Sequence, residues 1–147
     1  MTPTNVVDAL KRDEGLRLTP YKDTRGFTTI YYGHNLDANP LPAEVIAAAD
    51  EATASVVLLA DIARVQIRLF KDLPWIQRLP AVIQGVFINM SFNLGPIGLE
   101  GFHHMLDFAK AGDYNSAADA GTTSLWYKQV GSRAQRLMTQ LRTQEWQ

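Results

Sequence analysis

The stretch from Asp13 to His34 constrains this chain more than any other: D-E-G-L-R-L-T-P-Y-K-D-T-R-G-F-T-T-I-Y-Y-G-H. It places two carboxylic acids, Glu14 and Asp23, in a segment rich in turn formers and β-branched residues. Nearly everything after it is predicted to be helical. We therefore expect this stretch to carry the chemistry and the helices to build the structure around it.

Glu14 lies at the end of a predicted helix, capped by Thr4 and running from Asn5 to about Asp13. It continues the apolar face of that helix, and Gly15 is a C-cap signal. A carboxyl group at the negative end of a helix dipole and beside apolar surface has a raised pKa. A general acid working near neutral pH needs such a shift. The alternative is an ordinary solvent-exposed glutamate at a helix end.

A β-hairpin is predicted after this helix. Arg17–Thr19 begins one strand and Phe27–Tyr32 forms the other, while Pro20 and the D-T-R-G sequence at 23–26 indicate turns. Asp23 lies in the turn region, where a role as turn former alone is the alternative. Two carboxyl groups from different elements, with a hydroxyl group nearby, match the requirements of glycoside hydrolysis.

The stretch resembles the catalytic segment of the phage-type, T-even-like lysozymes and endolysins, glycoside hydrolase family 24. That family carries the pattern E-G-x-R-L-x-x-Y-x-D-x-x-G-x-x-T-I-G-x-G-H. The residues in register with it are Glu14, Gly15, Arg17, Leu18, Tyr21, Asp23, Gly26, Thr29, Ile30, Gly33 and His34.

The resemblance implies an inverting enzyme that hydrolyses the β-1,4 bond between N-acetylmuramic acid and N-acetylglucosamine in peptidoglycan. Glu14 would donate a proton to the leaving sugar oxygen, and Asp23 with Thr29 would position the attacking water. The two carboxyl groups of an inverting enzyme are about 6.5–9.5 Å apart. Two carboxyl groups and water suffice for this reaction, so no metal and no organic cofactor is expected.

Further site residues follow from the same resemblance. In I-N-M-S-F-N-L-G, Phe92 falls on a cleft-lining position and Asn93 lies beside it; Asn35, next to His34, is another predicted substrate contact. Arg133, within W-Y-x-x-x-x-x-R-A-x-R, matches a residue that pairs with the catalytic acid, and Asp61 matches a partner of His34. The structural alternatives are a core aromatic for Phe92 and a solvated helix face for Asp61.

Tyr31 departs from the family pattern, which has glycine there. Strand alternation places Tyr31 on the face of Thr29, where a phenol would crowd the water or stack on a sugar. If the backbone requires a glycine-only conformation, tyrosine also introduces strain. The alternative is a tolerated strand tyrosine, since its β propensity is high.

The expected fold is α+β and mostly helical, a single lysozyme-like domain over residues 1–147. A small lobe at about 13–50 holds a short antiparallel sheet, and a long helix at about 50–72 connects it to a helical lobe. That lobe covers about 73–147 plus the N-terminal helix, with the cleft between the lobes. Pro80 opens a central buried helix through Leu94, ended by Gly95-Pro96.

Composition narrows the possible partners. The net charge of −1 does not favour nucleic acid or membrane, and the chain has no cysteine for disulfides or thiolate metal sites. His103 and His104 are adjacent on a predicted helix and make a poor metal pair. No signal peptide and no membrane span is expected. We expect accumulation in the cytoplasm of the infected bacterial host, release by a phage holin to the periplasmic cell wall, and a monomer.

Three rival functions remain open. Tyr31 could leave a peptidoglycan-binding protein with impaired catalysis. The basic C-terminal helices could disrupt membranes without enzymatic activity. Lytic transglycosylase chemistry needs an acid but no water-positioning aspartate, so the presence of Asp23 and Thr29 argues against it.

Overall fold

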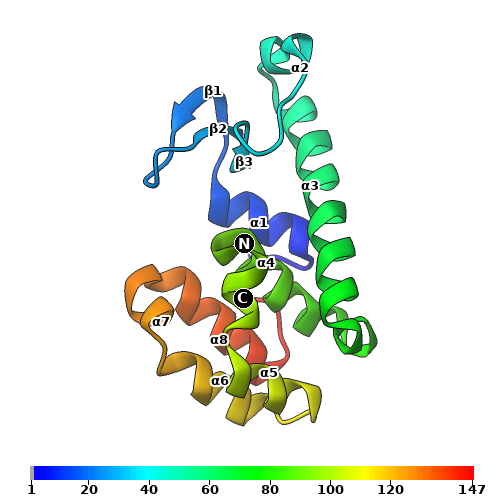
Figure 1. The fold of residues 1–147 in the computed structure, drawn as a ribbon, viewed down its shortest axis with the longest axis vertical. Helices are drawn as coiled ribbons and strands as arrows, with labels where there is room; N and C mark the ends of the chain where they lie inside the picture. The colour runs from blue at the N-terminus through cyan, green and yellow to red at the C-terminus, as the bar shows by residue number, and fades with distance from the viewer. Residues whose placement is uncertain (1) are drawn as a thin grey trace. The chain divides into compact units, whose positions relative to one another are not determined.

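The computed structural model describes residues 2–147, which divide into two compact units (Figure 1). The sheet unit comprises Leu10–Arg64, and the helical unit comprises the residues up to Ala9 together with Val65–Gln147. The expected class, α+β and mostly helical with a small antiparallel sheet, is confirmed.

The sheet unit begins in the second half of the first helix. Its elements, in chain order, are the end of α1 (Val6–Glu14), β1 (Arg17–Lys22), β2 (Thr28–Tyr31), β3 (His34–Asn35), α2 (Ala43–Ala48) and the first part of α3 (Glu51–Asp72). Both α1 and α3 continue into the helical unit without a break in the helix.

The ends of α1 show how local hydrogen bonds define a helix. The N-cap is Asn5, whose Oδ1 accepts the N–H of Asp8 at 2.9 Å, so the prediction that Thr4 caps this helix is wrong by one residue. At the other end the N–H of Gly15 bonds the carbonyl of Lys11 at 3.1 Å, and Gly15 has φ +72°. The predicted C-cap is therefore present, and it brings the helix to its end directly after Glu14.

The three strands pair in the order β1-β2-β3, all antiparallel. Tyr21 pairs with Thr29, and Ile30 pairs with His34. The ladder between β1 and β2 is irregular between Arg17 and Tyr21, where Pro20 lies. Pro20 was predicted to indicate a turn; it instead lies inside β1, where an irregular position of the ladder needs no N–H donor.

The helical unit is built around α4 (Ala81–Glu100). The other elements are η1 (Pro74–Arg78), α5 (His103–Lys110), α6 (Tyr114–Thr122), α7 (Leu125–Val130) and α8 (Ser132–Thr143). Gly95, at φ +75° and ψ 165°, interrupts α4 as predicted, but the helix resumes at Pro96. The resumed segment runs to Glu100, because proline is well suited to the first turn of a helix.

The first segment of α4 forms the core of the helical unit. Ile83, Val86 and Phe87 are fully buried, and the buried residues lie on most sides of the helix. Within residues 2–147, α4 is the helix whose length and hydropathy also suit a membrane span, with half of the hydrophobic window buried. That burial is typical of the core helix of a soluble protein.

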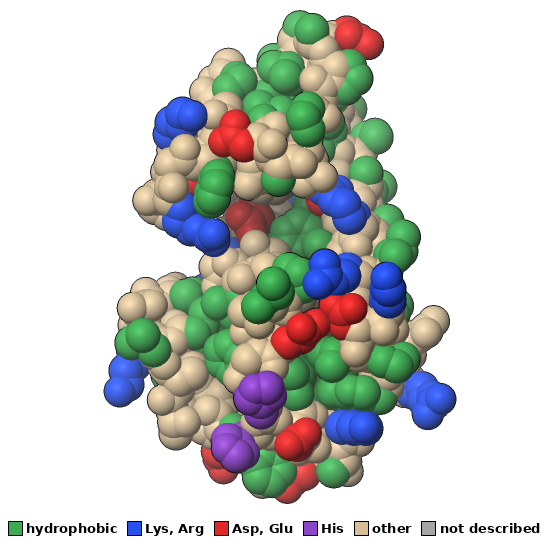
Figure 2. Space-filling model, viewed as in Figure 1, with side chains coloured by type: hydrophobic (Ala, Val, Ile, Leu, Met, Phe, Trp, Pro, Cys, Tyr) green, Lys and Arg blue, Asp and Glu red, His purple; other side chains and the backbone are tan. Residues whose placement is uncertain are grey.

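Several large apolar residues of α3 lie at the surface and not in the core. Val56, Leu59 and Ile67 are 67%, 53% and 71% exposed, whereas Val57, Leu58 and Ile62 are buried. Figure 2 shows hydrophobic side chains at the surface where α3 runs in Figure 1. Helical spacing identifies a stripe, but the neighbouring elements decide which stripe is covered.

Candidate active site

The carboxyl group of Glu14 lies directly against the backbone of Gly33. A methyl group on Gly33 would be 2.9 Å from Cδ and 3.3 Å from Cγ of Glu14, and closer still to Oε2. Gly33 also has φ +68°, which side chains other than glycine rarely adopt. Glycine is therefore required at position 33 both by conformation and by the close approach of this half-buried carboxyl group.

Asp23 builds the turn between β1 and β2. Its Oδ1 accepts the N–H groups of Arg25 and Phe27, each at 2.9 Å, and its own N–H bonds the carbonyl of Phe27. These bonds use one carboxylate oxygen, and Oδ2 has no hydrogen bond to any of residues 2–147. The turn-forming role is therefore present, and it fixes the carboxylate while leaving one oxygen able to accept a hydrogen bond from water.

Thr29 is buried on β2, and its hydroxyl donates to the carbonyl of Phe27 at 2.9 Å. The hydroxyl proton of Thr29 is therefore used in this hydrogen bond to the backbone. The lone pairs of Oγ1 remain as acceptors, so this hydroxyl group can accept a hydrogen bond from a water molecule.

Tyr21 lies close enough to the carboxyl groups of both Glu14 and Asp23 for their charges to affect its pKa. Burial is the largest cause that raises the pKa of its phenol; the Arg17 charge lowers it, and the charges of Glu14 and Asp23 raise it. The Arg17 guanidinium stacks on the Tyr21 ring, 4.1 Å from its centroid. Arg17 and Tyr21 both match the family pattern, but no role was predicted for them. Their match to the family pattern was the sequence signal that could have identified them as site residues.

Tyr31 is not on the face predicted for it. Its φ is +60°, so the strand alternation that would align it with Thr29 fails at this residue. The side chain is fully buried, and its hydroxyl bonds the backbone of α2. The expectation that Tyr31 crowds the water or stacks on a sugar is therefore wrong, because a side chain with no exposed surface cannot contact a sugar.

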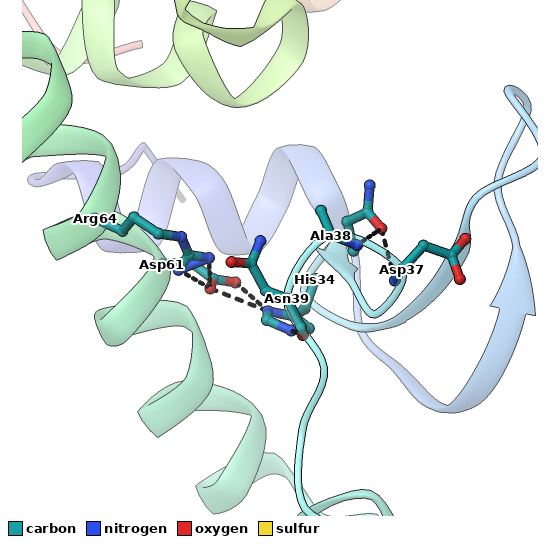
Figure 3. Close-up of polar contacts among 7 residues, drawn as sticks. His34, Asp37, Ala38, Asn39, Asp61 and Arg64 are labelled. Atoms are coloured by element: carbon teal, nitrogen blue, oxygen red, sulfur yellow. Dashed lines mark hydrogen bonds and ion pairs between the residues drawn. The ribbon is translucent and has the colours of Figure 1, made fainter.

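His34 and Asp61 form the buried pair that the resemblance implied (Figure 3). Nδ1 of His34 lies 2.7 Å from Oδ2 of Asp61, and Nε2 lies 2.7 Å from the carbonyl oxygen of Asn39. Arg64 donates to Oδ1 of Asp61 at 2.6 and 2.9 Å. Since both ring nitrogens face acceptors, the charged imidazolium satisfies both contacts, whereas the neutral ring satisfies one.

The pKa of His34 is raised as a result. Burial, the largest single cause, lowers it, but the hydrogen bonds to Asp61 and Asn39 and the charge of Asp61 together outweigh burial and the opposing charge of Arg64. This network attaches the segment that follows the β2–β3 loop to α3 (Figure 3).

Asn35 has a turn-forming role in the structure. Its Oδ1 accepts the N–H groups of Asp37 at 2.9 Å and Ala38 at 3.0 Å. The amide nitrogen is the part of this half-buried side chain left for other contacts. Its predicted contact with substrate stays a prediction.

In the helical unit, Asn93 lines a pocket of about 460 Å³. Nε1 of Trp126 donates to Oδ1 of Asn93 at 2.6 Å, so the Asn93 amide nitrogen is the group left to donate to a ligand. The Phe102 ring packs edge-on against Trp126, with centroids 5.8 Å apart. Phe92 is half-buried on α4 and is not among the residues lining this pocket.

Arg133 donates from Nε to Oδ1 of Asn89 at 2.9 Å. Its predicted pairing with the catalytic acid stays a prediction.

His103 and His104 are exposed at the start of α5 (Figure 2). Within residues 2–147 no three histidine or carboxylate side chains gather as a group that could hold a metal ion.

Comparison with known proteins identifies the family. Residues 11–145 match the family model described as phage lysozyme. The chain is also 31% identical over 157 aligned positions to the "Pre-baseplate central spike protein Gp5" of Enterobacteria phage T4. That alignment covers 90% of this chain but 27% of the relative, so the chain spans about a quarter of the relative's length. With nearly all of its residues matched by the model, this chain belongs to the phage lysozyme family.

Proposed function

We propose that this protein hydrolyses the β-1,4 bond between N-acetylmuramic acid and N-acetylglucosamine in peptidoglycan, with inversion at the anomeric carbon. The observation that carries the proposal is the arrangement in the sheet unit. Glu14 packs on Gly33, while Asp23 is fixed by its own turn with Oδ2 left open. Family membership supports the same chemistry.

In the proposed reaction Glu14 protonates the glycosidic oxygen as the bond from that oxygen to the anomeric carbon breaks. A water molecule held by Oδ2 of Asp23 and Oγ1 of Thr29 attacks the anomeric carbon from the opposite face. Asp23 accepts the proton that this water loses. The turn bonds of Asp23 and the Thr29–Phe27 bond hold both groups in place before substrate binds, which lowers the entropic cost of reaching the transition state.

For the helical unit we propose substrate contacts through Asn93 and Phe92. Because Trp126 occupies Oδ1 of Asn93, the amide N–H groups are oriented to donate to a carbonyl oxygen, such as that of an acetamido group or a peptide. Asn35 would contribute a similar donor from the sheet unit.

Two biological roles suit this activity. As an endolysin, the protein would accumulate in the cytoplasm of the infected host, act as a monomer, and need a holin to reach the periplasmic wall. The similarity to a central spike protein favours a second role, a wall-degrading domain of a phage particle. Mass spectrometry of purified phage particles separates the roles, since a particle component is present in them and an endolysin is not.

The decisive experiment compares the parent with Glu14→Gln and Asp23→Asn on purified peptidoglycan. We expect the parent to release reducing ends, Glu14→Gln to lose at least 100-fold in kcat, and proton NMR to show the inverted anomer first. Products with 1,6-anhydro ends would establish transglycosylase chemistry instead. Equal bacterial killing by the parent and Glu14→Gln would favour membrane disruption, and tight binding without cleavage would favour the binding-protein alternative.

A further inference from the structure

Tyr31 has a backbone conformation that its residue type disfavours. In the sheet unit, Tyr31 at φ +60° and Ala49 at φ +48° are the described residues other than glycine with positive φ. A bulky side chain in this region is strained, and such strain persists only where the surroundings hold the residue in place. Strained residues of this kind cluster at functional sites.

The two strained residues are joined by a single phenol. The Tyr31 hydroxyl donates to the carbonyl of Val45 at 2.5 Å, with that of Ile46 at 3.4 Å, and accepts the N–H of Ala49 at 3.2 Å. Ala49 is the C-cap of α2 and left-handed. The phenol thus bonds backbone groups that the end of a helix leaves without helical partners.

Tyr31 is also the last residue of β2, directly before the turn that ends against Glu14. Ile30 pairs with His34, so residues 31–33 are the segment between these two paired residues of β2 and β3. Gly33, the third of these residues, is the one whose backbone contacts the Glu14 carboxyl group. The conformation at residue 31 therefore determines where residue 33 lies, because only Tyr32 separates them.

We propose that Tyr31 is a positioning residue for Glu14. Its hydroxyl group, held by the C-terminal turn of α2, keeps the 31–33 segment in the conformation that places Gly33 against the Glu14 carboxyl group. Glu14 in turn is the proposed acid, so the kinetic part of this inference rests on the function proposed above. The inference that Tyr31 fixes the position of Glu14 does not depend on whether the protein is catalytically active.

The test compares the parent with Tyr31→Phe and a matched control, Tyr32→Phe. Both substitutions remove one phenol hydroxyl from neighbouring, buried residues, but Tyr32 bonds the Glu51 side chain at 3.1 Å rather than the α2 backbone. Three quantities are measured: kcat and KM on peptidoglycan, hydrogen exchange of the Ala49 amide, and the NMR titration of the Glu14 carboxyl carbon.

In Tyr31→Phe we expect faster exchange at Ala49, a shifted Glu14 titration, and kcat lower by about tenfold with KM within twofold, since small displacements of a catalytic group cost rate. Tyr32→Phe should match the parent in all three. If Tyr31→Phe does not fold, Tyr31→Gly removes the phenol and tolerates the positive φ, with the same expectations.

An unchanged Glu14 titration together with an unchanged kcat in Tyr31→Phe overturns the proposal, as does unchanged exchange at Ala49. If the parent itself releases no reducing ends, the proposed function fails. In that case the Glu14 titration in Tyr31→Phe still decides whether Tyr31 positions Glu14.

Discussion

The two units of the protein are stabilised by different kinds of contact. In the sheet unit, side chains bond the backbone: Asp23 builds its turn, Oδ2 of Asp37 accepts the N–H of Thr28 at 2.8 Å, and Tyr31 holds the end of α2. In the helical unit, the buried side chains of α4 are mostly apolar, with Asn89 and Ser91 as the exceptions, and Trp75 packs edge-on against Phe87.

This difference explains why the proposed acid and base lie in the sheet unit. A unit built on polar contacts can fix a carboxylate by hydrogen bonds without burying it completely. It also carries charged groups, so its stability depends on pH. An apolar core resists pH change but is sensitive to the loss of volume. Four substitutions with matched controls test this contrast.

The largest effect is expected in the core of the helical unit. Phe87→Ala removes a fully buried ring and should lower the free energy of unfolding by about 3–5 kcal/mol. Ile97→Ala, at a residue that is 77% exposed, should stay within about 0.5 kcal/mol of the parent. Urea denaturation followed by circular dichroism measures both. A Phe87→Ala loss equal to that of Ile97→Ala would contradict an apolar core at this position.

Next in size is the effect of Gly33→Ala on activity. The added methyl group displaces the Glu14 carboxyl, so we expect kcat to fall about 100-fold, part of what a positioned acid contributes. Gly112→Ala is the control, since φ is +80° and nothing lies within 4 Å of the added carbon. Both variants should lose about 1–2 kcal/mol of stability to the left-handed backbone. Equal kcat values in the two variants would refute the contact.

A pH dependence is expected from His34. Its pKa is higher in the folded chain than its ordinary value of 6.5, so the folded state binds more protons between the two values. This contribution to stability is complete below the ordinary value and is lost as the pH rises through the raised one. His34→Asn should abolish this slope and, at low pH, cost about 1–3 kcal/mol because Asp61 loses a buried partner.

The exposed His104 supplies the control for that measurement. His104→Asn should keep the parent's pH dependence. Thermal unfolding from pH 5 to 9 for the three proteins distinguishes them. The same slope in parent and His34→Asn would show that another group is responsible.

The smallest effect is expected for a polar side chain of the helical unit that bonds the backbone. Ser124 caps α7, accepting the N–H of Tyr127 at 3.2 Å, so Ser124→Ala should cost about 1 kcal/mol. Ser132→Ala, at the exposed first residue of α8, should cost less than half of that. Differential scanning calorimetry resolves the difference. Equal shifts in Tm would mean that the Ser124 hydroxyl adds nothing as a cap.

Much of the fold could be predicted because it depends on neighbours in sequence. The start of α3 is an example: it lies where the helix was predicted to begin, and Asp50 accepts the N–H of Thr53 at 2.8 Å. Asp113 likewise caps α6 through Ser116. The short strand β3 was missed, because a strand of two residues has no pattern of its own and exists only through its pairing with β2.

In the candidate site, too, the features that depend on neighbours in sequence could be predicted and those that depend on distant segments could not. The motif itself located Glu14, Asp23 and Thr29, since these residues belong to one continuous stretch, and the turn chemistry of Asp23 is local. The orientation of Tyr31 could not be predicted. Strand alternation assumes extended backbone, and the residue leaves that conformation because α2, from later in the chain, offers backbone partners for its hydroxyl.

The sequence by itself determined the family, the mostly helical class, the hairpin turn and the identity of the proposed acid and base, all through short-range chemistry and a contiguous motif. Tertiary structure alone decided which face of α3 is covered, that Gly33 lies against Glu14, and that Tyr31 points into the protein. Those features depend on segments far apart in the chain, and burial is a property of the partners that cover a residue rather than of the residue itself.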